Sequence, residues 1–134
     1  MSGFTAVLLY IVWTLLLALA YAGYRVPLIL IGSKRADHWE RGQPSDDPPV
    51  LVRAKGAHLN CIENFPLFAA VVVVAALLGK SAVVDGVAAY VLYARIGQSV
   101  VHLIGTSLPL IAIRATLYLI QVALVLYMAW SLLR

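Results

Sequence analysis

Four long apolar stretches, separated by short polar segments, dominate the pattern of hydrophobic and polar positions along the chain. Each stretch falls in the range of roughly 17 to 25 residues with which a helix crosses a bilayer, or exceeds it slightly. The pattern therefore predicts an all-α integral membrane protein, a bundle of four transmembrane helices forming one membrane domain over residues 1–134. The expected spans are residues 4–31, 50–79, 87–104 and 110–133, with a polar loop over residues 32–49.

Composition supports a membrane protein and argues against a nucleic-acid partner. The chain is 63% hydrophobic and only 12% charged, whereas soluble domains carry about 25% charged residues. Its net charge of +4 reflects lysines and arginines that gather in loops beside membrane spans. The single cysteine, Cys61, excludes an internal disulfide and provides no set of metal ligands. We therefore expect neither a metal site nor nucleic-acid binding.

The basic residues predict how the chain is oriented in the membrane. The first loop contains Lys34, Arg35 and Arg41, whereas no lysine or arginine precedes the first span. Only Lys80 and Arg134 fall on the opposite side. Because cytoplasmic loops carry an excess of basic residues, we expect this loop in the cytoplasm and both termini opposite. Short loops and the lack of an organelle signal indicate a bacterial inner membrane.

Polar residues in the later spans fall on narrow helical faces. At 100° per residue, Arg53 and Asn60 lie within about 20° of each other, with Glu63 about 60° further round. The third and fourth spans each repeat such a stripe. These stripes are Arg95, Gln98 and His102 in the third span, and Arg114, Tyr118 and Gln121 in the fourth.

All three stripes lie in the cytoplasmic half of their spans under this orientation. Ionisable residues in membranes usually face a bundle interior or a wet cavity. Three arginines, Arg53, Arg95 and Arg114, are matched by one carboxylate, Glu63, and forked guanidinium groups suit carboxylate ligands. The stripes therefore predict a basic pocket that opens towards the cytoplasm. The alternative is that Arg53 or Arg95 forms a structural ion pair with Glu63 and holds the bundle together.

Other polar side chains have simpler explanations. Cys61 is expected as a small buried hydrophobe rather than a nucleophile. We expect His58 to be an interfacial histidine bonded to a loop, with a proton carrier as the alternative. Tyr118 could donate a hydrogen bond to a ligand or merely pack.

The stretch RAKGAHLNCIENFPLF, residues 53–68, resembles the signature of the MAPEG family, the membrane-associated proteins of eicosanoid and glutathione metabolism. That signature has an arginine, then an asparagine, a glutamate three residues on, and an aromatic–proline pair at the start of an apolar run. The four spans, the polar first loop, Arg95 and Arg114 agree with the family over nearly the whole chain. The resemblance implies a homotrimer that binds glutathione between neighbouring subunits, towards the cytoplasmic side.

The resemblance also implies roles for individual residues. Asn60 and Glu63 would bind the glutathione peptide, and Arg53 and Arg95 would hold carboxylates or organise the pocket. Arg114 would be the catalytic residue, because an adjacent cation lowers the pKa of a thiol from about 8.5 and so stabilises the thiolate. The full expected glutathione-binding set is Arg53, Asn60, Glu63, Arg95, Gln98, His102 and Tyr118, with Arg114 as the catalytic group.

The predicted function is a membrane-bound enzyme that conjugates glutathione to lipophilic electrophiles from the bilayer, or reduces them with glutathione. Two departures from the family pattern bear on this. Gly56 stands where the family's eukaryotic enzymes have an arginine, and Gln98 and His102 replace tyrosines that often contact glutathione. The alternatives are a non-catalytic relative that binds a lipid or a partner protein, and a small multidrug-type transporter. Such transporters place an acidic residue in the first span, which has none here.

Overall fold

The computed structural model describes all 134 residues and contains five α-helices and no strands. They are α1 (Gly3–Leu30), α2 (Pro49–Leu77), α3 (Ser81–Asp85), α4 (Ala88–Ile104) and α5 (Leu108–Leu133). Four helical segments are long and apolar enough to cross a membrane, with α3 and α4 together forming the third. The predicted fold class, an integral membrane bundle of four transmembrane helices, is confirmed.

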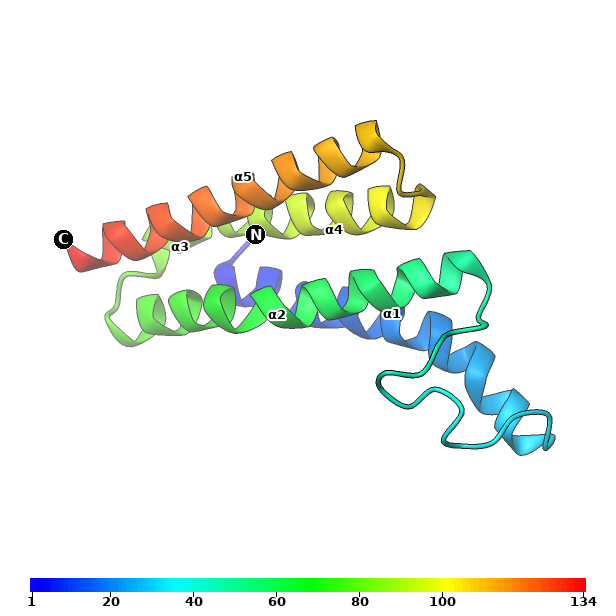
Figure 1. Ribbon diagram of the computed structural model, residues 1–134. Helices are drawn as coiled ribbons and strands as arrows, with labels where there is room; N and C mark the ends of the chain where they lie inside the picture. The colour runs from blue at the N-terminus through cyan, green and yellow to red at the C-terminus, as the bar shows by residue number, and fades with distance from the viewer.

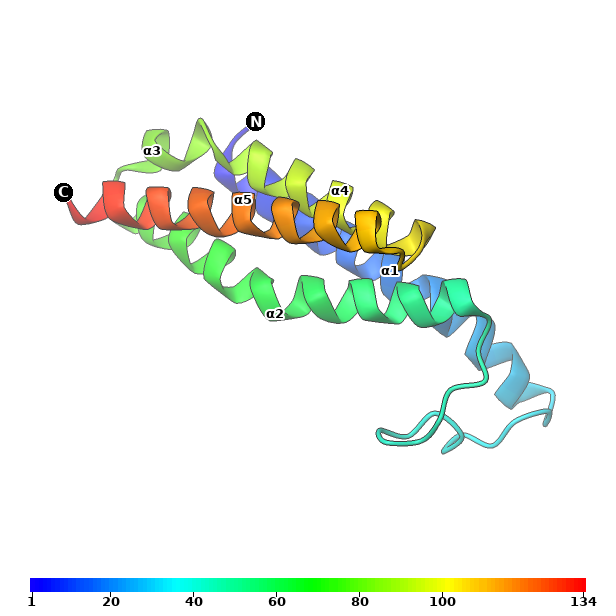
Figure 2. The ribbon, with the colours of Figure 1, turned by 45° about the horizontal axis from the view of Figure 1, so that its top comes forward.

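The helices run up and down in chain order, so that α1 and α2 form one antiparallel pair and α4 and α5 another (Figure 1). The polar loop and the α4–α5 turn lie at one end of the bundle, and both termini lie at the other. The last turns of α1 and the loop extend beyond the other helices (Figure 2). The short helix α3 was not expected, since the predicted second span ended at residue 79 and the third began at residue 87.

Local sequence signals explain where the helices begin and end. Ser2 caps α1 by accepting a hydrogen bond from the backbone N–H of Thr5 at 3.1 Å, and Pro49 occupies the first turn of α2, where its missing N–H costs least. Gly32 and Gly79 follow α1 and α2 with φ of +75° and +67°. Glycine adopts this left-handed conformation without strain, so both glycines fix the direction in which the chain leaves the helix.

The core lies where the four long helices meet. Tyr10, Phe68 and Met128 are almost completely buried there. The hydroxyl of Tyr10 donates a hydrogen bond to the backbone carbonyl of Cys61 at 3.0 Å, which satisfies a polar group in an apolar setting. Cys61 is itself fully buried, with its Sγ 3.7 Å from the hydroxyl of Ser99. Its predicted role as a small buried hydrophobe is confirmed.

Asp47 fastens the polar loop to α1. Its fully buried carboxylate accepts hydrogen bonds from Arg25 Nε at 3.1 Å and Nη2 at 2.7 Å, and from Trp39 Nε1 at 2.8 Å. The guanidinium of Arg25 also lies over the rings of Tyr21 and Trp39, at 5.1 and 5.2 Å from their centroids. A buried charge needs such compensation, so these contacts hold the loop against the end of α1.

A second carboxylate, Asp46, organises the outer part of the loop. It accepts a hydrogen bond from Lys34 Nζ at 2.8 Å, and His38 Nε2 lies 2.9 Å from its other oxygen. The hydrogen bond from Lys34, followed by that from His38, lowers the pKa of Asp46 from 3.8 to about 2. The same hydrogen bond raises the pKa of Lys34. Both groups therefore carry full charge at neutral pH.

Candidate functional site

An open groove of about 680 Å³ lies between α2, α4 and α5. It brings together five of the residues that the sequence analysis assigned to a site, and these come from all three polar stripes. They are Asn60, Glu63, Gln98, Arg114 and Tyr118, and the groove is completed by Asn64, Leu67, Ile111 and Ala115. The central residues of the three stripes therefore share one cavity.

The wall formed by α2 follows from helical spacing. Asn60, Glu63, Asn64 and Leu67 stand at positions i, i+3, i+4 and i+7, which lie on one face of a helix. The side-chain amide of Asn64 donates to the backbone carbonyl of Asn60 at 2.9 Å. Glu63 is exposed and forms no ion pair within the chain. Its carboxylate is free to bind a cationic group of a ligand.

The opposite wall comes from α4 and α5. Gln121 donates to the Oε1 of Gln98 at 2.9 Å, which occupies the acceptor of Gln98 and leaves its amide NH₂ as the group available to a ligand. The Nε of Arg114 is buried and has no hydrogen-bond partner. Arg114 lines the groove and forms no ion pair within the chain, so its guanidinium can bind an anion there.

Three expected site residues lie outside the groove: Arg53, Arg95 and His102. The Nε of Arg53 donates to the backbone carbonyl of Leu103 at 3.0 Å, which satisfies a free carbonyl at the end of α4. Arg95 is only 1% exposed. Its guanidinium lies 5.9 Å from the ring centroid of Tyr10, with Nε and Nη2 unpaired.

The ring of His102 packs directly against Gly56 of α2. Its Nδ1 is buried without a hydrogen-bond partner. The two departures from the family pattern at positions 56 and 102 are therefore in contact. A side chain at position 56 would need the space that the His102 ring occupies.

The structural ion pairs considered as an alternative do not form. The four ion pairs of the structure involve Arg25, Lys34, Arg35 and His38, all at the end of α1 or in the loop. Neither Arg53 nor Arg95 pairs with Glu63 of the same chain, so the predicted ion pair within the bundle is absent. The arginines of the three stripes thus have no carboxylate partner within the chain, which favours an anionic ligand.

His58 has a different partner from the one expected. The hydroxyl of Tyr21 lies 2.7 Å from His58 Nδ1, so the histidine is bonded to α1 and not to the loop. Arg25, Asp47 and Asn64 were not predicted from the sequence to make these contacts. A lone arginine in an apolar stretch was a signal for the first, and the i+4 spacing from Asn60 was a signal for Asn64.

No group of three or more His, Cys, Asp or Glu side chains converges where it could hold a metal ion. The chemistry of the groove thus comes from arginine, carboxylate, amide and phenol groups. The model of the MAPEG family matches residues 3–134, which include all four spans and every residue of the groove. No curated protein and no solved structure matches the chain significantly.

Proposed function

Since the chain belongs to the MAPEG family, we propose that it is a membrane-bound enzyme that uses glutathione to conjugate or reduce lipophilic electrophiles. The observation that carries the proposal is the groove in which Arg114, Glu63, Asn60 and Gln98 meet. Glutathione offers an ammonium group, carboxylates, peptide amides and a thiol. The groove contains a carboxylate for the ammonium group, amides for the peptide groups and a guanidinium for the thiolate, and no other cavity of the chain combines a cation with a carboxylate.

Each groove residue has a role in this proposal. Glu63 binds the α-amino group of glutathione, and the amides of Asn60 and Gln98 bind its peptide groups. Arg114 pairs with the thiolate, because a fixed cation favours the ionised sulfur. The thiol proton passes to solvent through the open side of the groove. Tyr118, next along the groove, donates a hydrogen bond to the leaving group or to the sulfur.

The glutathione sulfur is the nucleophile in both reactions, conjugation and reduction. In conjugation, the sulfur bonds to the electrophilic carbon while the bond from that carbon to the leaving group breaks, and the leaving group departs with the electron pair. In reduction, the sulfur attacks a peroxide oxygen, the O–O bond breaks, and the alkoxide takes a proton from solvent. A further glutathione then displaces water from the oxidised sulfur and yields the disulfide.

The open side of the groove supports assembly as a homotrimer, as is common among MAPEG proteins. Glu63 is exposed on the surface of a single protomer, and Tyr118 is 40% exposed. A neighbouring subunit that covers this side would exclude lipid from the charged groups and complete the glutathione site. Under the proposed orientation the site opens to the cytoplasm, with both termini opposite, in a bacterial inner membrane.

Calorimetric titration with glutathione tests the proposal directly. Two buffers of different ionisation enthalpy should give different apparent heats, and the difference measures the proton released when the thiolate forms. Saturable binding with proton release supports the enzyme. Binding without proton release, or no binding by an intact oligomer, supports the non-catalytic alternative instead.

The role of Arg114 is tested by Arg114→Ala. This variant should bind glutathione without releasing a proton and should lose turnover by roughly 100-fold or more, the scale on which one lost stabilising donor acts. The matched control is Arg35→Ala, since Arg35 is exposed in the loop and pairs only with Asp37. Unchanged turnover in Arg114→Ala would remove Arg114 from the mechanism.

A further inference from the structure

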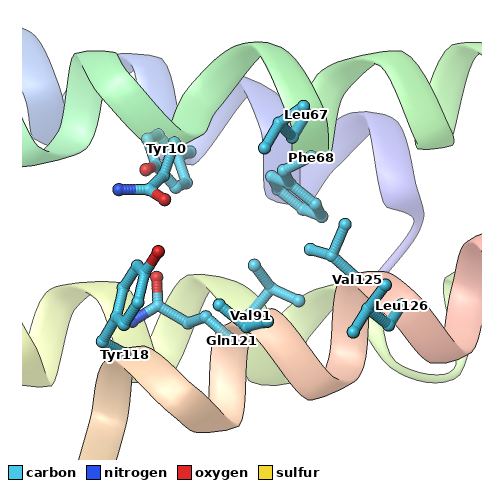
Figure 3. A pocket seen from close by; sticks show the side chains of 10 residues that line it. Tyr10, Leu67, Phe68, Val91, Tyr118, Gln121, Val125 and Leu126 are labelled. Atoms are coloured by element: carbon cyan, nitrogen blue, oxygen red, sulfur yellow. The ribbon is translucent and has the colours of Figure 1, made fainter. Parts of the chain in front are cut away.

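Two apolar cavities lie between α2 and α5, at different depths in the bundle. The first, of about 220 Å³, adjoins the groove, with Phe68 of α2 on one side and Val125 and Leu126 of α5 on the other (Figure 3). No charged side chain lines it. The second, of about 300 Å³, lies at the end of the bundle where the termini lie (Figure 1), and we call it the terminal cleft. Its lining is entirely hydrophobic: Ala70, Val71, Val74 and Leu78 on one side, and Ala129, Leu132 and Leu133 on the other.

The terminal cleft follows from the spacing of small and apolar side chains on two helices. Ala70, Val74 and Leu78 stand at positions i, i+4 and i+8, which lie on one face of a helix. Ala129 and Leu133 of α5 stand at i and i+4, again on one face. The alanines on the two facing helices leave space that larger side chains would fill.

The cleft has a buried floor and an open side. Leu132 is 8% exposed, whereas Leu78 and Leu133 are 55% and 80% exposed. The open side therefore admits an apolar chain laterally, from within the bilayer. A volume of about 300 Å³ lies at the lower end of the range for ligand pockets, so the cleft takes part of an acyl chain and not a whole lipid.

Lys80 lies at the mouth of the terminal cleft. It follows Leu78 by two residues, and its ammonium donates a hydrogen bond to the backbone carbonyl of Leu132 at 3.3 Å. Both leucines line the cleft. This carbonyl lies in the last turn of α5, where no helical N–H remains to bond it, so a lysine is favoured there. The bond uses one of the three ammonium N–H donors, and the others can bind a headgroup phosphate.

A second cation, Arg134, extends the basic region at this end of the bundle. Its guanidinium lies 5.4 Å from the ring centroid of Trp130, and tryptophan is typical of the interfacial layer where lipid headgroups lie. Neither Arg134 nor Lys80 forms an ion pair within the chain. Asp85, the acidic residue at this end, accepts a hydrogen bond from the backbone N–H of Gly3 at 2.7 Å. Cations for a phosphate are therefore present, without a free acidic side chain for the ammonium of a zwitterionic headgroup.

We propose that the terminal cleft binds an anionic phospholipid from the leaflet on the side of the termini. One acyl chain lies between α2 and α5, and the headgroup phosphate pairs with Lys80 and reaches Arg134, because lysine binds phosphate as a point charge. A lipid that contacts both helices holds the end of α5 against α2. The site takes no part in the glutathione chemistry, so its test is independent of the proposed function.

Two photoreactive lipids with the same diazirine-bearing acyl chain test the headgroup preference: a phosphatidylglycerol and a phosphatidylcholine. Each is added to the full-length protein in nanodiscs of unlabelled phosphatidylcholine, and mass spectrometry locates the crosslinked residues. Labelling of residues 70–78 and 129–133 is measured relative to Leu119, which is exposed on α5 and lines no cavity. The phosphatidylglycerol probe should label both segments about fivefold more strongly, the scale on which one basic residue attracts anionic lipid.

Two variants of Lys80 separate its charge from its hydrogen bond. Lys80→Gln keeps a donor for the carbonyl of Leu132 but has no charge. It should lower labelling by phosphatidylglycerol about fivefold and leave labelling by phosphatidylcholine unchanged. Lys80→Arg keeps the charge and should keep the preference. The matched control is Arg35→Ala, which removes an exposed cation from the polar loop at the opposite end of the bundle.

A pair of neighbouring valines tests the cleft itself. Val74 lines the cleft and Val73 does not, although the two are 45% and 46% exposed. Val74→Phe fills the cleft and should reduce labelling of both segments to the level at Leu119. Val73→Phe should leave the labelling unchanged.

Three results would overturn the proposal. Equal labelling by the two probes contradicts the headgroup pairing, as does a phosphatidylglycerol preference that Lys80→Gln retains or Lys80→Arg loses. Equal effects of Val73→Phe and Val74→Phe contradict the cleft as the site of the acyl chain. A subunit contact that covers the cleft and leaves both segments unlabelled excludes the lipid altogether.

Discussion

The ring of His102 lies where any side chain at position 56 would begin. A Cβ atom on Gly56 would come within 2.8 Å of His102 Cε1 and 3.3 Å of Nε2, closer than van der Waals contact. Gly56 stands where the family's eukaryotic enzymes have an arginine. His102 stands where the family often has a third-span tyrosine that contacts glutathione. In this chain the two residues are in contact. The two departures therefore compensate each other sterically.

Gly56→Ala should expose this coupling. We expect it to lower the free energy of unfolding by about 1 kcal/mol, because the added methyl pushes the His102 ring from its position. In a His102→Ala background the same change should stabilise the protein slightly, since alanine favours helices over glycine. Unfolding in mixed micelles measures the double-mutant cycle. The control is Gly97→Ala, whose Cβ would meet only Leu117 at an ordinary 3.5 Å; a cycle with no coupling contradicts the prediction.

Asp47→Ala should release the polar loop. Removing the carboxylate leaves Arg25 and Trp39 without their partner, and breaking a buried pair costs about 3–5 kcal/mol. Trypsin should then cut the loop faster after Arg35 and Arg41, which mass spectrometry of the fragments would show. Asp37→Ala is the control, because Asp37 pairs with Arg35 only at the exposed surface. Equal cleavage rates in the two variants would mean that Asp47 does not fasten the loop.

The outer part of the loop should lose its contacts only in strong acid. The pKa of Asp46 is lowered to about 2, so its contribution is fully present above its ordinary pKa of 3.8 and is lost as the pH falls through about 2. Carbon-13 NMR of the Asp46 carboxyl should give this midpoint. In Lys34→Ala the midpoint should rise towards 3.8, because the hydrogen bond from Lys34 is the largest cause of the shift. A midpoint of 3.8 in the unmodified protein would contradict the assigned contacts.

The proposed orientation predicts which membrane face exposes the loop. In inside-out vesicles trypsin should cut at Arg35 and Arg41, whereas right-side-out vesicles should protect both sites. A tag at either terminus should show the opposite pattern, since both ends of the chain lie at the other end of the bundle. Cleavage in right-side-out vesicles only would reverse the orientation and place the groove on the outer side.

The positions of the long helices could be predicted closely because the need to satisfy backbone hydrogen bonds in a bilayer applies to each apolar segment separately. Unpaired backbone groups are too costly in hydrocarbon, so each long apolar stretch must form a helix. The expected first span, residues 4–31, and the observed α1, Gly3–Leu30, differ by one residue at each end. Gly32 and Gly79 end α1 and α2 through their own backbone conformation, which also depends only on the local sequence. The helix α3 was missed, because five residues, Ser81–Asp85, are too few for a periodic pattern.

The residues of the groove were predicted less evenly. Helical spacing placed Arg95 and Gln98 on one stripe, yet Gln98 lines the groove and Arg95 lies against Tyr10 outside it. The difference depends on how α4 is rotated and which helix covers each turn, and spacing along one helix does not contain that information. The same holds for Asp47, whose burial depends on a loop that folds back against α1.

The sequence by itself determined that this protein crosses the membrane four times, belongs among MAPEG-like chains and carries polar stripes on three helices. Hydropathy and helical periodicity are properties of single segments, so the sequence contains them directly. Only the tertiary structure decided which stripe residues meet, that the stripe arginines have no carboxylate partner within the chain, and that an apolar cavity adjoins the groove. Those outcomes depend on how the helices are rotated and how side chains pack between segments distant in sequence. On α4, for example, Gln98 lines the groove, whereas Arg95, one turn earlier, is buried outside it.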